Sequence, residues 1–185
     1  MFKKKFPVFI VIVFLTLIFN ASLRAQDNLK IILIRHAEKP AQGDNLNCQG
    51  LNRSMQLPAV IVKKFGLPNY VYVPNLNATK GTKRSRAFQT VLPLSIKYNL
   101  SINSSFDVED SKGLVNDISA KKGLVLVCWE HHELTKIMKA FGVKPTNLKW
   151  AENDFDGIWT ITYQNGKAVF SADKENLKPK INCTY

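Results

Sequence analysis

Residues 29–39 read LKIILIRHAEK, an apolar run that changes abruptly into arginine, histidine and glutamate. The β-branched content and the length of residues 31–34 are typical of a strand that is covered on both faces, as in a mostly parallel sheet. Open α/β sheets bind their ligands beyond the carboxyl ends of their strands. The polar residues that end this run are therefore candidates for a functional site.

Arg35 and His36 are the first of these polar residues, and together they suit phosphate chemistry. A guanidinium offers a planar fork of donors for a phosphate, and a neutral imidazole beside it can attack phosphorus. A dipeptide of this kind more often does no more than end a strand at the surface. The interpretation of the pair therefore depends on partners elsewhere in the chain.

Two such partners occur further along the sequence. Arg86 lies in SRAFQT, residues 85–90, and His131 comes one glutamate after the apolar run LVLVCW, residues 124–129. Taken in order, RHAE, RAFQT and LVLVCWEH resemble the histidine phosphatase superfamily, which includes cofactor-dependent phosphoglycerate mutase and many small phosphatases. The resemblance extends over about residues 29–163.

The resemblance implies a role for each of these residues. His36 would attack the phosphorus of a phosphate monoester and become transiently phosphorylated, while Arg35, Arg86 and His131 would hold the non-bridging oxygens. Positive charge aimed at the phosphoryl group is the main catalytic contribution in such chemistry. The mechanism needs neither a metal ion nor another cofactor, so we expect none.

The second histidine of the pocket could be either member of the pair His131 and His132. In the superfamily this histidine follows its strand directly, so the resemblance assigns the role to His131. Because neighbouring residues do not share a helix face, we expect His132 to turn away from the pocket. The same geometry argues against a metal site on the adjacent pair.

The acid that protonates the leaving oxygen has three candidates, Glu109, Asp110 and Glu130. No motif selects one of them. The resemblance favours Glu109, because mutase-like members keep their acid in the segment after the helix that carries Arg86. Glu38 belongs to the RHAE motif, and we expect it to orient the loop or Arg35.

The alternation of apolar strands and amphipathic helices predicts an α/β fold, with three layers (α/β/α) and a mostly parallel central sheet. Strands over residues 29–34 and 124–129 should run parallel, either adjacent or one strand apart. The other elements predicted up to residue 142 are helices over residues 50–65, 87–98, 112–120 and 134–142 and strands over residues 70–73 and 101–103. The first helix has an expected apolar face that includes Leu51, Met55 and Ile61.

Two alternating apolar runs near the C-terminus, residues 158–163 and 168–171, flank Asn165 and Gly166. Asn-Gly between two β-type runs is a strong hairpin signal, so we expect an antiparallel hairpin at one edge of the sheet. The tail over residues 173–185 is charged, which is typical of a less ordered segment unless Cys183 is bonded.

Residues 1–25 have the parts of a secretory signal: three lysines, a short apolar core and small residues before a possible cut after Ala25. We therefore divide the chain into a signal peptide (1–25), a histidine phosphatase-like domain (26–172) and a C-terminal tail (173–185). An uncleaved N-terminal membrane anchor is the alternative; after cleavage no stable membrane span is expected. In both cases the catalytic part is secreted or periplasmic.

The chain is basic, with a formal net charge of +12 that falls to +8 after cleavage because residues 1–25 contain four basic residues and no acidic one. This charge suits an anionic substrate. The lysines are scattered and no nucleic-acid motif occurs, so we expect a small phosphorylated substrate and no nucleic acid.

The three cysteines also fit an oxidising compartment. Cys48 and Cys183 lie in polar surroundings and could pair, whereas Cys128 lies inside an apolar strand and should be a buried thiol. The wide separation of the cysteines along the sequence argues against zinc.

Two functions from different classes follow. The first is an exported phosphomonoesterase, a metal-independent hydrolase resembling histidine acid phosphatases, with a phosphohistidine intermediate on His36. The second is a non-catalytic envelope protein that binds a phosphorylated or other anionic ligand in the same basic pocket. A mutase is a weaker third hypothesis, because an exported protein would rarely meet glycolytic intermediates.

Overall fold

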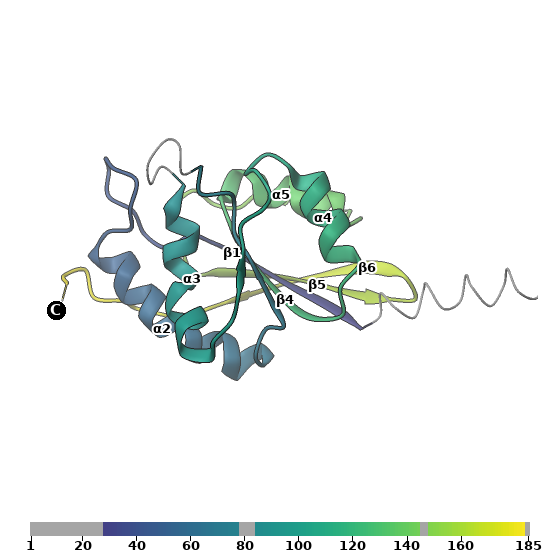
Figure 1. Ribbon diagram of the computed structural model, residues 1–185, viewed down its shortest axis with the longest axis horizontal. Helices are drawn as coiled ribbons and strands as arrows, with labels where there is room; N and C mark the ends of the chain where they lie inside the picture. Colours follow the sequence, from purple (N-terminus) through teal and green to yellow (C-terminus); the bar gives the residue numbers. More distant parts are fainter. Residues whose placement is uncertain (1–27, 78–83, 145–147, 184–185) are drawn as a thin grey trace, which may run out of the picture.

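The computed structural model describes residues 28–77, 84–144 and 148–183, which form one sheet with helices on both faces (Figure 1). The predicted signal sequence, residues 1–25, lies outside the described residues. The elements in chain order are β1 (Leu29–Arg35), α2 (Cys48–Phe65), β2 (Tyr70–Tyr72), α3 (Ser85–Tyr98), β3 (Ile102–Asn103), α4 (Ser111–Ser119), β4 (Gly123–Trp129), α5 (His131–Ala140), β5 (Gly157–Gln164) and β6 (Lys167–Lys174). Within the described ranges, no helix is both long and apolar enough to cross a bilayer.

The sheet has the strand order β3-β2-β4-β1-β5-β6. Strands β3, β2, β4 and β1 are parallel, and β5 pairs with β1 in the antiparallel sense. The strands β1 and β4, which carry the two apolar runs, are direct neighbours, with Leu29 opposite Gly123 and Arg35 opposite Trp129. The predicted parallel pairing is therefore confirmed, and the carboxyl ends of both strands meet at one edge of the sheet.

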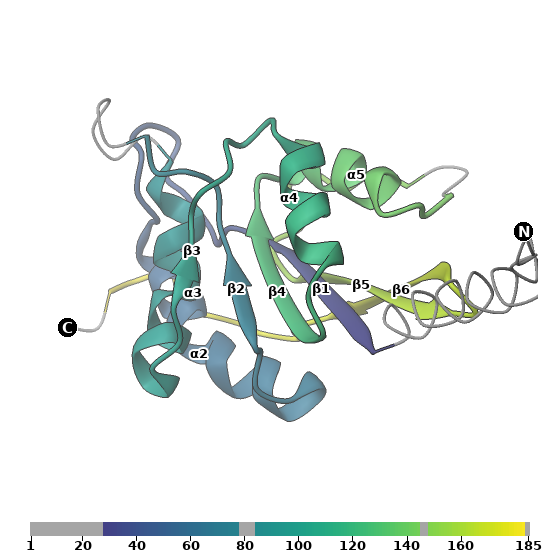
Figure 2. The same cartoon turned by 45° about the vertical axis from the view of Figure 1, so that its right-hand side comes forward.

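Helices α2 and α3 cover one face of the sheet, and α4 and α5 cover the other (Figures 1 and 2). Successive residues of β1 alternate between the two cores: Ile31 and Leu33 pack with α4 and α5, and Ile32 and Ile34 pack with α2 and α3. This alternation explains why a central parallel strand is apolar throughout. The predicted three-layer α/β/α fold is confirmed.

Helix α2 presents a different face to the sheet than its apolar pattern predicted. Leu51 and Met55, expected inside, are exposed, with 37% and 65% of their surface accessible. Ile61 is buried as predicted, and it shares the buried face with Arg53 and Leu57, which precede it at intervals of four residues. The helix is rotated in this way because Arg53 forms buried ion pairs beneath it.

The C-terminal hairpin forms as predicted, with β5 antiparallel to β6 and with Asn165 and Gly166 at positive φ in the turn. Strand β6 continues to Lys174, beyond the boundary expected at residue 172. The chain then returns to α2, where Cys183 forms a disulfide with Cys48. The predicted pairing is confirmed, and Cys128 is a buried free thiol, also as predicted.

Replacing both Cys48 and Cys183 by serine should lower the thermal stability. The bridge spans 135 residues of sequence, and the loop-closure model puts its contribution at up to about 5 kcal/mol. In a domain of this size, such a loss lowers Tm by about 10 °C or more. Calorimetry measures the effect: a thiol reductant should bring the wild-type Tm down to that of the double variant and leave the variant unchanged. Equal Tm values without reductant would contradict this contribution.

Candidate active site

The first candidate residues lie where β1 and β4 end side by side. Arg35 is the last residue of β1, and the backbone N–H of His36 donates to the carbonyl of Trp129 at 3.1 Å. His36 therefore lies next to the start of α5, which carries His131 as its first residue. The parallel register of the two strands brings residues 95 positions apart in the sequence to the same point.

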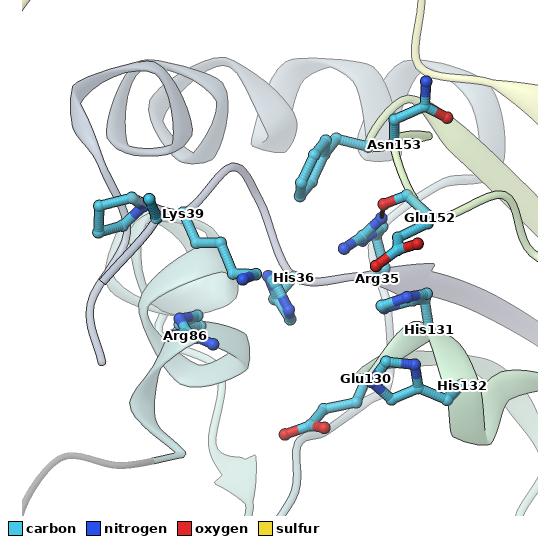
Figure 3. A pocket seen from close by; sticks show the side chains of 12 residues that line it. Arg35, His36, Lys39, Arg86, Glu130, His131, His132, Glu152 and Asn153 are labelled. Atoms are coloured by element: carbon cyan, nitrogen blue, oxygen red, sulfur yellow. Dashed lines mark hydrogen bonds between the residues drawn. The ribbon is translucent and has the colours of Figure 1, made fainter. Parts of the chain in front are cut away.

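An open cavity of about 780 Å³ lies at this edge of the sheet, and Arg35, His36, Arg86 and His131 all line it (Figure 3). Figure 3 shows Arg86 and Lys39 on one side of His36, and Arg35 and His131 on the other. The structure thus brings together the four residues that the sequence motifs singled out for phosphate chemistry.

His36 is held in one tautomer by the backbone. Its Nδ1 lies 2.8 Å from the carbonyl oxygen of Ala37, and because a carbonyl can only accept, Nδ1 carries the proton. The lone pair of the neutral ring is therefore on Nε2. Burial, followed by the positive charges of Arg35 and Arg86, lowers the pKa of His36 to about 4, so the ring is neutral and nucleophilic at neutral pH.

Arg35 is almost fully buried and packs beside the aromatic ring of Phe155, with its guanidinium carbon 3.9 Å from the ring centroid. Its Nη1 donates to the carbonyls of Glu152 at 2.5 Å and Asp154 at 3.3 Å. Burial lowers the pKa of Arg35 to about 10, which still leaves it charged at neutral pH. A charged, desolvated guanidinium of this kind binds an oxyanion more strongly than an exposed one does.

Arg86 enters the cavity from the first turn of α3. Its guanidinium donates to the carbonyl of Gly43, and Thr90, one turn later, accepts from the Ala37 N–H at 2.9 Å and donates to the Arg86 carbonyl at 2.8 Å. Thr90 thus joins the loop that carries His36 to the helix that carries Arg86. The RAFQT motif therefore contributes both an anion-binding side chain and the hydroxyl that holds it in place.

The two adjacent histidines at the start of α5 differ in burial. His131 is half-buried and His132 is exposed, and their ring centroids are 3.9 Å apart. The expectation that His132 turns away from the pocket is wrong, because both rings line the cavity. Burial, with the nearby charge of Arg35, lowers the pKa of His131 to about 4.

Helices α3 and α5 both begin at the cavity. Arg86 in the first turn of α3 and His131 in the first turn of α5 both line it. Neither helix has a side-chain cap. Free N–H groups and the positive end of the helix dipole favour an anion at such a position. In addition, no described residue accepts a hydrogen bond from Arg35 Nε, Arg86 Nε or His131 Nδ1, all of which are buried. The site is therefore chemically matched to an oxyanion.

The three candidate acids occupy different places. Glu130 lines the cavity beside His131, and its side chain makes no capping hydrogen bond to α5. Asp110 instead caps α4, where it accepts from the Gly113 N–H at 2.8 Å, and Glu109 is exposed in the turn before α4. Neither Glu109 nor Asp110 lines the cavity. The preference for Glu109 is therefore corrected, because the position of Glu130 alone is compatible with contact to a substrate there.

Some residues of the site had no signal in the sequence. Glu152 and Phe155 line the cavity from the irregular segment before β5, where no motif marks them. Lys39 also reaches the cavity, although it stands where the superfamily pattern often has threonine. Glu38 is not among the residues that line the cavity, and its carboxylate pairs with Arg53 at 2.8 Å.

The described residues contain no group of three or more histidine, cysteine, aspartate or glutamate side chains arranged to hold a metal ion. The polar side chains that line the cavity are three histidines, two arginines, Lys39, Asn153 and two carboxylic acids, Glu130 and Glu152.

No protein-family model matches the chain, and a comparison with curated proteins finds no match either. Solved structures do match it. A phosphoserine phosphatase variant from Entamoeba histolytica in complex with phosphoserine is 13% identical, with a TM-score of 0.55, over 80% of this chain and 98% of that one. A mycobacterial glucosyl-3-phosphoglycerate phosphatase in complex with inorganic phosphate is 12% identical, with a TM-score of 0.53, over 78% and 95%. A phosphoglycerate mutase from Plasmodium falciparum is 11% identical, with a TM-score of 0.52, over 85% and 97%.

These three structures belong to the histidine phosphatase superfamily. The matches extend over nearly the whole length of each solved chain and over most of this one, so they concern the complete sheet and not a local motif. The chain thus has the fold of the histidine phosphatase superfamily, as RHAE, RAFQT and LVLVCWEH predicted.

Proposed function

We propose that this protein is an exported phosphomonoesterase that hydrolyses phosphate esters through a phosphohistidine intermediate on His36, without a metal ion. One observation carries the proposal: a neutral histidine with its lone pair on Nε2 lies in a cavity that two arginines and two helix N-termini make favourable for an oxyanion. The similar folds of a phosphoserine phosphatase and a glucosyl-3-phosphoglycerate phosphatase support a phosphatase.

Export is supported by the signal-like N-terminus and by the disulfide between Cys48 and Cys183. Structural disulfides persist in secreted and periplasmic proteins and are rare in a reducing cytosol. An exported enzyme would meet phosphate esters outside the cytoplasm, which favours hydrolysis over a mutase reaction on glycolytic intermediates.

The proposed reaction has two steps. The Nε2 lone pair of His36 forms a bond to phosphorus while the bond from phosphorus to the leaving oxygen breaks, and that oxygen takes a proton from Glu130. Water then attacks the phosphohistidine, gives its proton to the Glu130 carboxylate and releases inorganic phosphate. Throughout, Arg35, Arg86 and His131 stabilise the charge on the non-bridging oxygens.

Glu130 is the proposed proton donor because it lies in the cavity and its side chain does not cap the helix that follows. It also lines a smaller hollow beside the cavity, together with His36 and Arg86. A general acid must come within hydrogen-bond reach of the leaving oxygen, and the place of Glu130 in the lining of both hollows is compatible with that requirement.

A non-catalytic binding protein is the competing hypothesis, because the same basic cavity would hold a phosphorylated ligand without turnover. Hydrolysis of an aryl phosphate, whose good leaving group hardly needs an acid, separates the two hypotheses. Turnover by the purified mature protein supports the enzyme, and tight phosphate binding without turnover supports the binding protein.

Replacing His36 by alanine should abolish hydrolysis without unfolding the protein. The side chain lies at a strand end facing the cavity, so its loss removes the nucleophile and little of the core. Aryl phosphate hydrolysis measures the rate, acid-quenched labelling with a radioactive phosphate ester detects the phosphohistidine, and circular dichroism checks the fold. Activity near wild type in a folded His36→Ala protein would rule out this nucleophile.

The two adjacent histidines should differ in their effect on the rate. His131→Ala removes a half-buried donor at the phosphate site and should cost about 10²-fold or more in kcat. His132→Ala removes an exposed ring at the rim and should change kcat less than about threefold, within the range of a weak contact. Measurement of kcat for the two single variants makes the comparison. A large loss of kcat in His132→Ala and a small one in His131→Ala would exchange the roles assigned to the two histidines.

Glu130→Gln should slow the hydrolysis of alkyl phosphates by about 10²-fold or more while affecting aryl phosphates much less. The reason is that an alkoxide needs a proton to leave, whereas an aryl oxide leaves without one. Glu109→Gln is the matched control, because it makes the same chemical change outside the cavity and should affect neither substrate. An equal loss on both substrates in Glu130→Gln would exclude a general-acid role.

A further inference from the structure

Arg53 stands outside the cavity, yet it is the centre of a buried ion-pair cluster directly behind it. The side chain is only 6% exposed, and it makes a two-point contact with Glu38, with Nη2 to Oε1 at 2.8 Å and Nε to Oε2 at 2.9 Å. Its Nη1 reaches Glu175 at 2.5 Å and Asp156 at 3.2 Å. One guanidinium thus joins α2, the loop after β1, the segment before β5 and the segment after β6.

Arg53 pairs with Glu38, which belongs to the same loop as His36, the proposed nucleophile. Glu38 follows Ala37, whose carbonyl accepts from His36 Nδ1 and thereby leaves the lone pair on Nε2. The Glu38 carbonyl also accepts from the Asn47 N–H at 3.0 Å, and a Cβ added at Gly50 would collide with that carbonyl. Movement of Glu38 would therefore move the carbonyl that sets the tautomer of His36.

The composition of the cluster argues for a purpose other than stability. Three carboxylates surround one guanidinium, and burying charges costs free energy that an apolar replacement of similar size would avoid. Burial, opposed by the charge of Arg53, raises the pKa of Glu175 to about 7, and the nearby carboxylates of Asp156 and Glu38 raise it further. A guanidinium can hold a carboxylate in a fixed two-point geometry, which an apolar side chain cannot do.

We infer that Arg53 is a positioning residue for the proposed reaction: it fixes Glu38, and through the loop it fixes the ring of His36 with Nε2 directed at the phosphate. Glu175, which is brought back to α2 by the C-terminal segment, holds Arg53 in turn. The inference rests on the proposed function for its kinetic consequence, but the orientation of the His36 ring is a property of the free protein.

The test compares Arg53→Lys with Lys64→Ala. Lysine at position 53 keeps the positive charge but loses the two-point contact with Glu38. Lys64→Ala is the matched control, because Lys64 and Asp173 form another ion pair between α2 and β6, at 2.8 Å, that is exposed and does not contact Glu38. Thermal unfolding of both variants shows whether each is folded.

The first measurement is nitrogen-15 NMR of the histidine rings in free protein. With only three histidines in the sequence, the signals can be assigned by single substitution. Wild type and Lys64→Ala should show His36 protonated on Nδ1 with a pKa of about 4. In Arg53→Lys, a mixture of tautomers is expected, with the pKa of His36 rising toward its ordinary value of about 6.5 as the loop admits water.

The second measurement is steady-state hydrolysis of an aryl phosphate. Arg53→Lys should lower kcat by about 10²-fold, because a small misplacement of the nucleophile is costly, and should change KM less than about threefold, because Arg35 and Arg86 still bind the substrate. Lys64→Ala should leave both constants unchanged. Glu38→Gln, which keeps the size of the side chain and removes its charge, should lower kcat as Arg53→Lys does.

The outcomes are separable. A folded Arg53→Lys protein with an unchanged His36 tautomer, pKa and kcat overturns the inference. If Arg53→Lys does not fold, Glu38→Gln carries the same test with the same criteria. An altered His36 ring in a protein whose wild type has no turnover supports the positioning role and overturns the proposed function.

Discussion

Arg35 and His36 are almost fully buried at the carboxyl end of β1, with 2% and 4% of their surface exposed, and this burial sets requirements for other parts of the chain. A buried guanidinium needs acceptors, which the carbonyls of Glu152 and Asp154 supply from the segment before β5. Burial, together with the positive charges of Arg35 and Arg86, lowers the pKa of His36 to about 4, so its imidazole is neutral at neutral pH. The same desolvation that costs stability therefore keeps His36 neutral and would strengthen the attraction of Arg35 for an anion.

Support for this buried pair comes from both faces of the sheet and from the C-terminus. Thr90 of α3 holds the N–H of Ala37, and Arg53 of α2 holds the side chain of Glu38. The C-terminal segment returns across α2 to place Glu175 against Arg53, and a disulfide joins its end to the first residue of the same helix (Figure 1). The tail was expected to be less ordered unless Cys183 is bonded, and the bonded tail carries Glu175 to Arg53.

Predictions that rest on a pattern within one short segment were more accurate than those that depend on contacts between distant segments. Strands β1 and β4 were recognised because an apolar run with β-branched residues is interpretable without knowledge of its neighbours, and the Asn165-Gly166 turn has a local backbone requirement. For α2, the prediction was right for Ile61 and wrong for Leu51 and Met55. The apolar pattern took no account of Arg53, although its spacing from Leu57 and Ile61 places it on the buried face. An arginine in register with apolar residues was the available signal for a buried ion pair.

The hydrophobic pattern and the motifs at the strand ends were sufficient to predict the α/β class, the parallel neighbours β1 and β4, and four residues that line the cavity. The folded structure was needed to show that Glu130, of the three candidate acids, lines the cavity, and that His132, Glu152 and Phe155 line it too. Those positions depend on how irregular segments return over the edge of the sheet, and Arg53 acquires its partners from segments 15, 103 and 122 residues away. Hydrophobic periodicity contains no information about such long-range pairings, since they arise from packing and charge satisfaction in three dimensions.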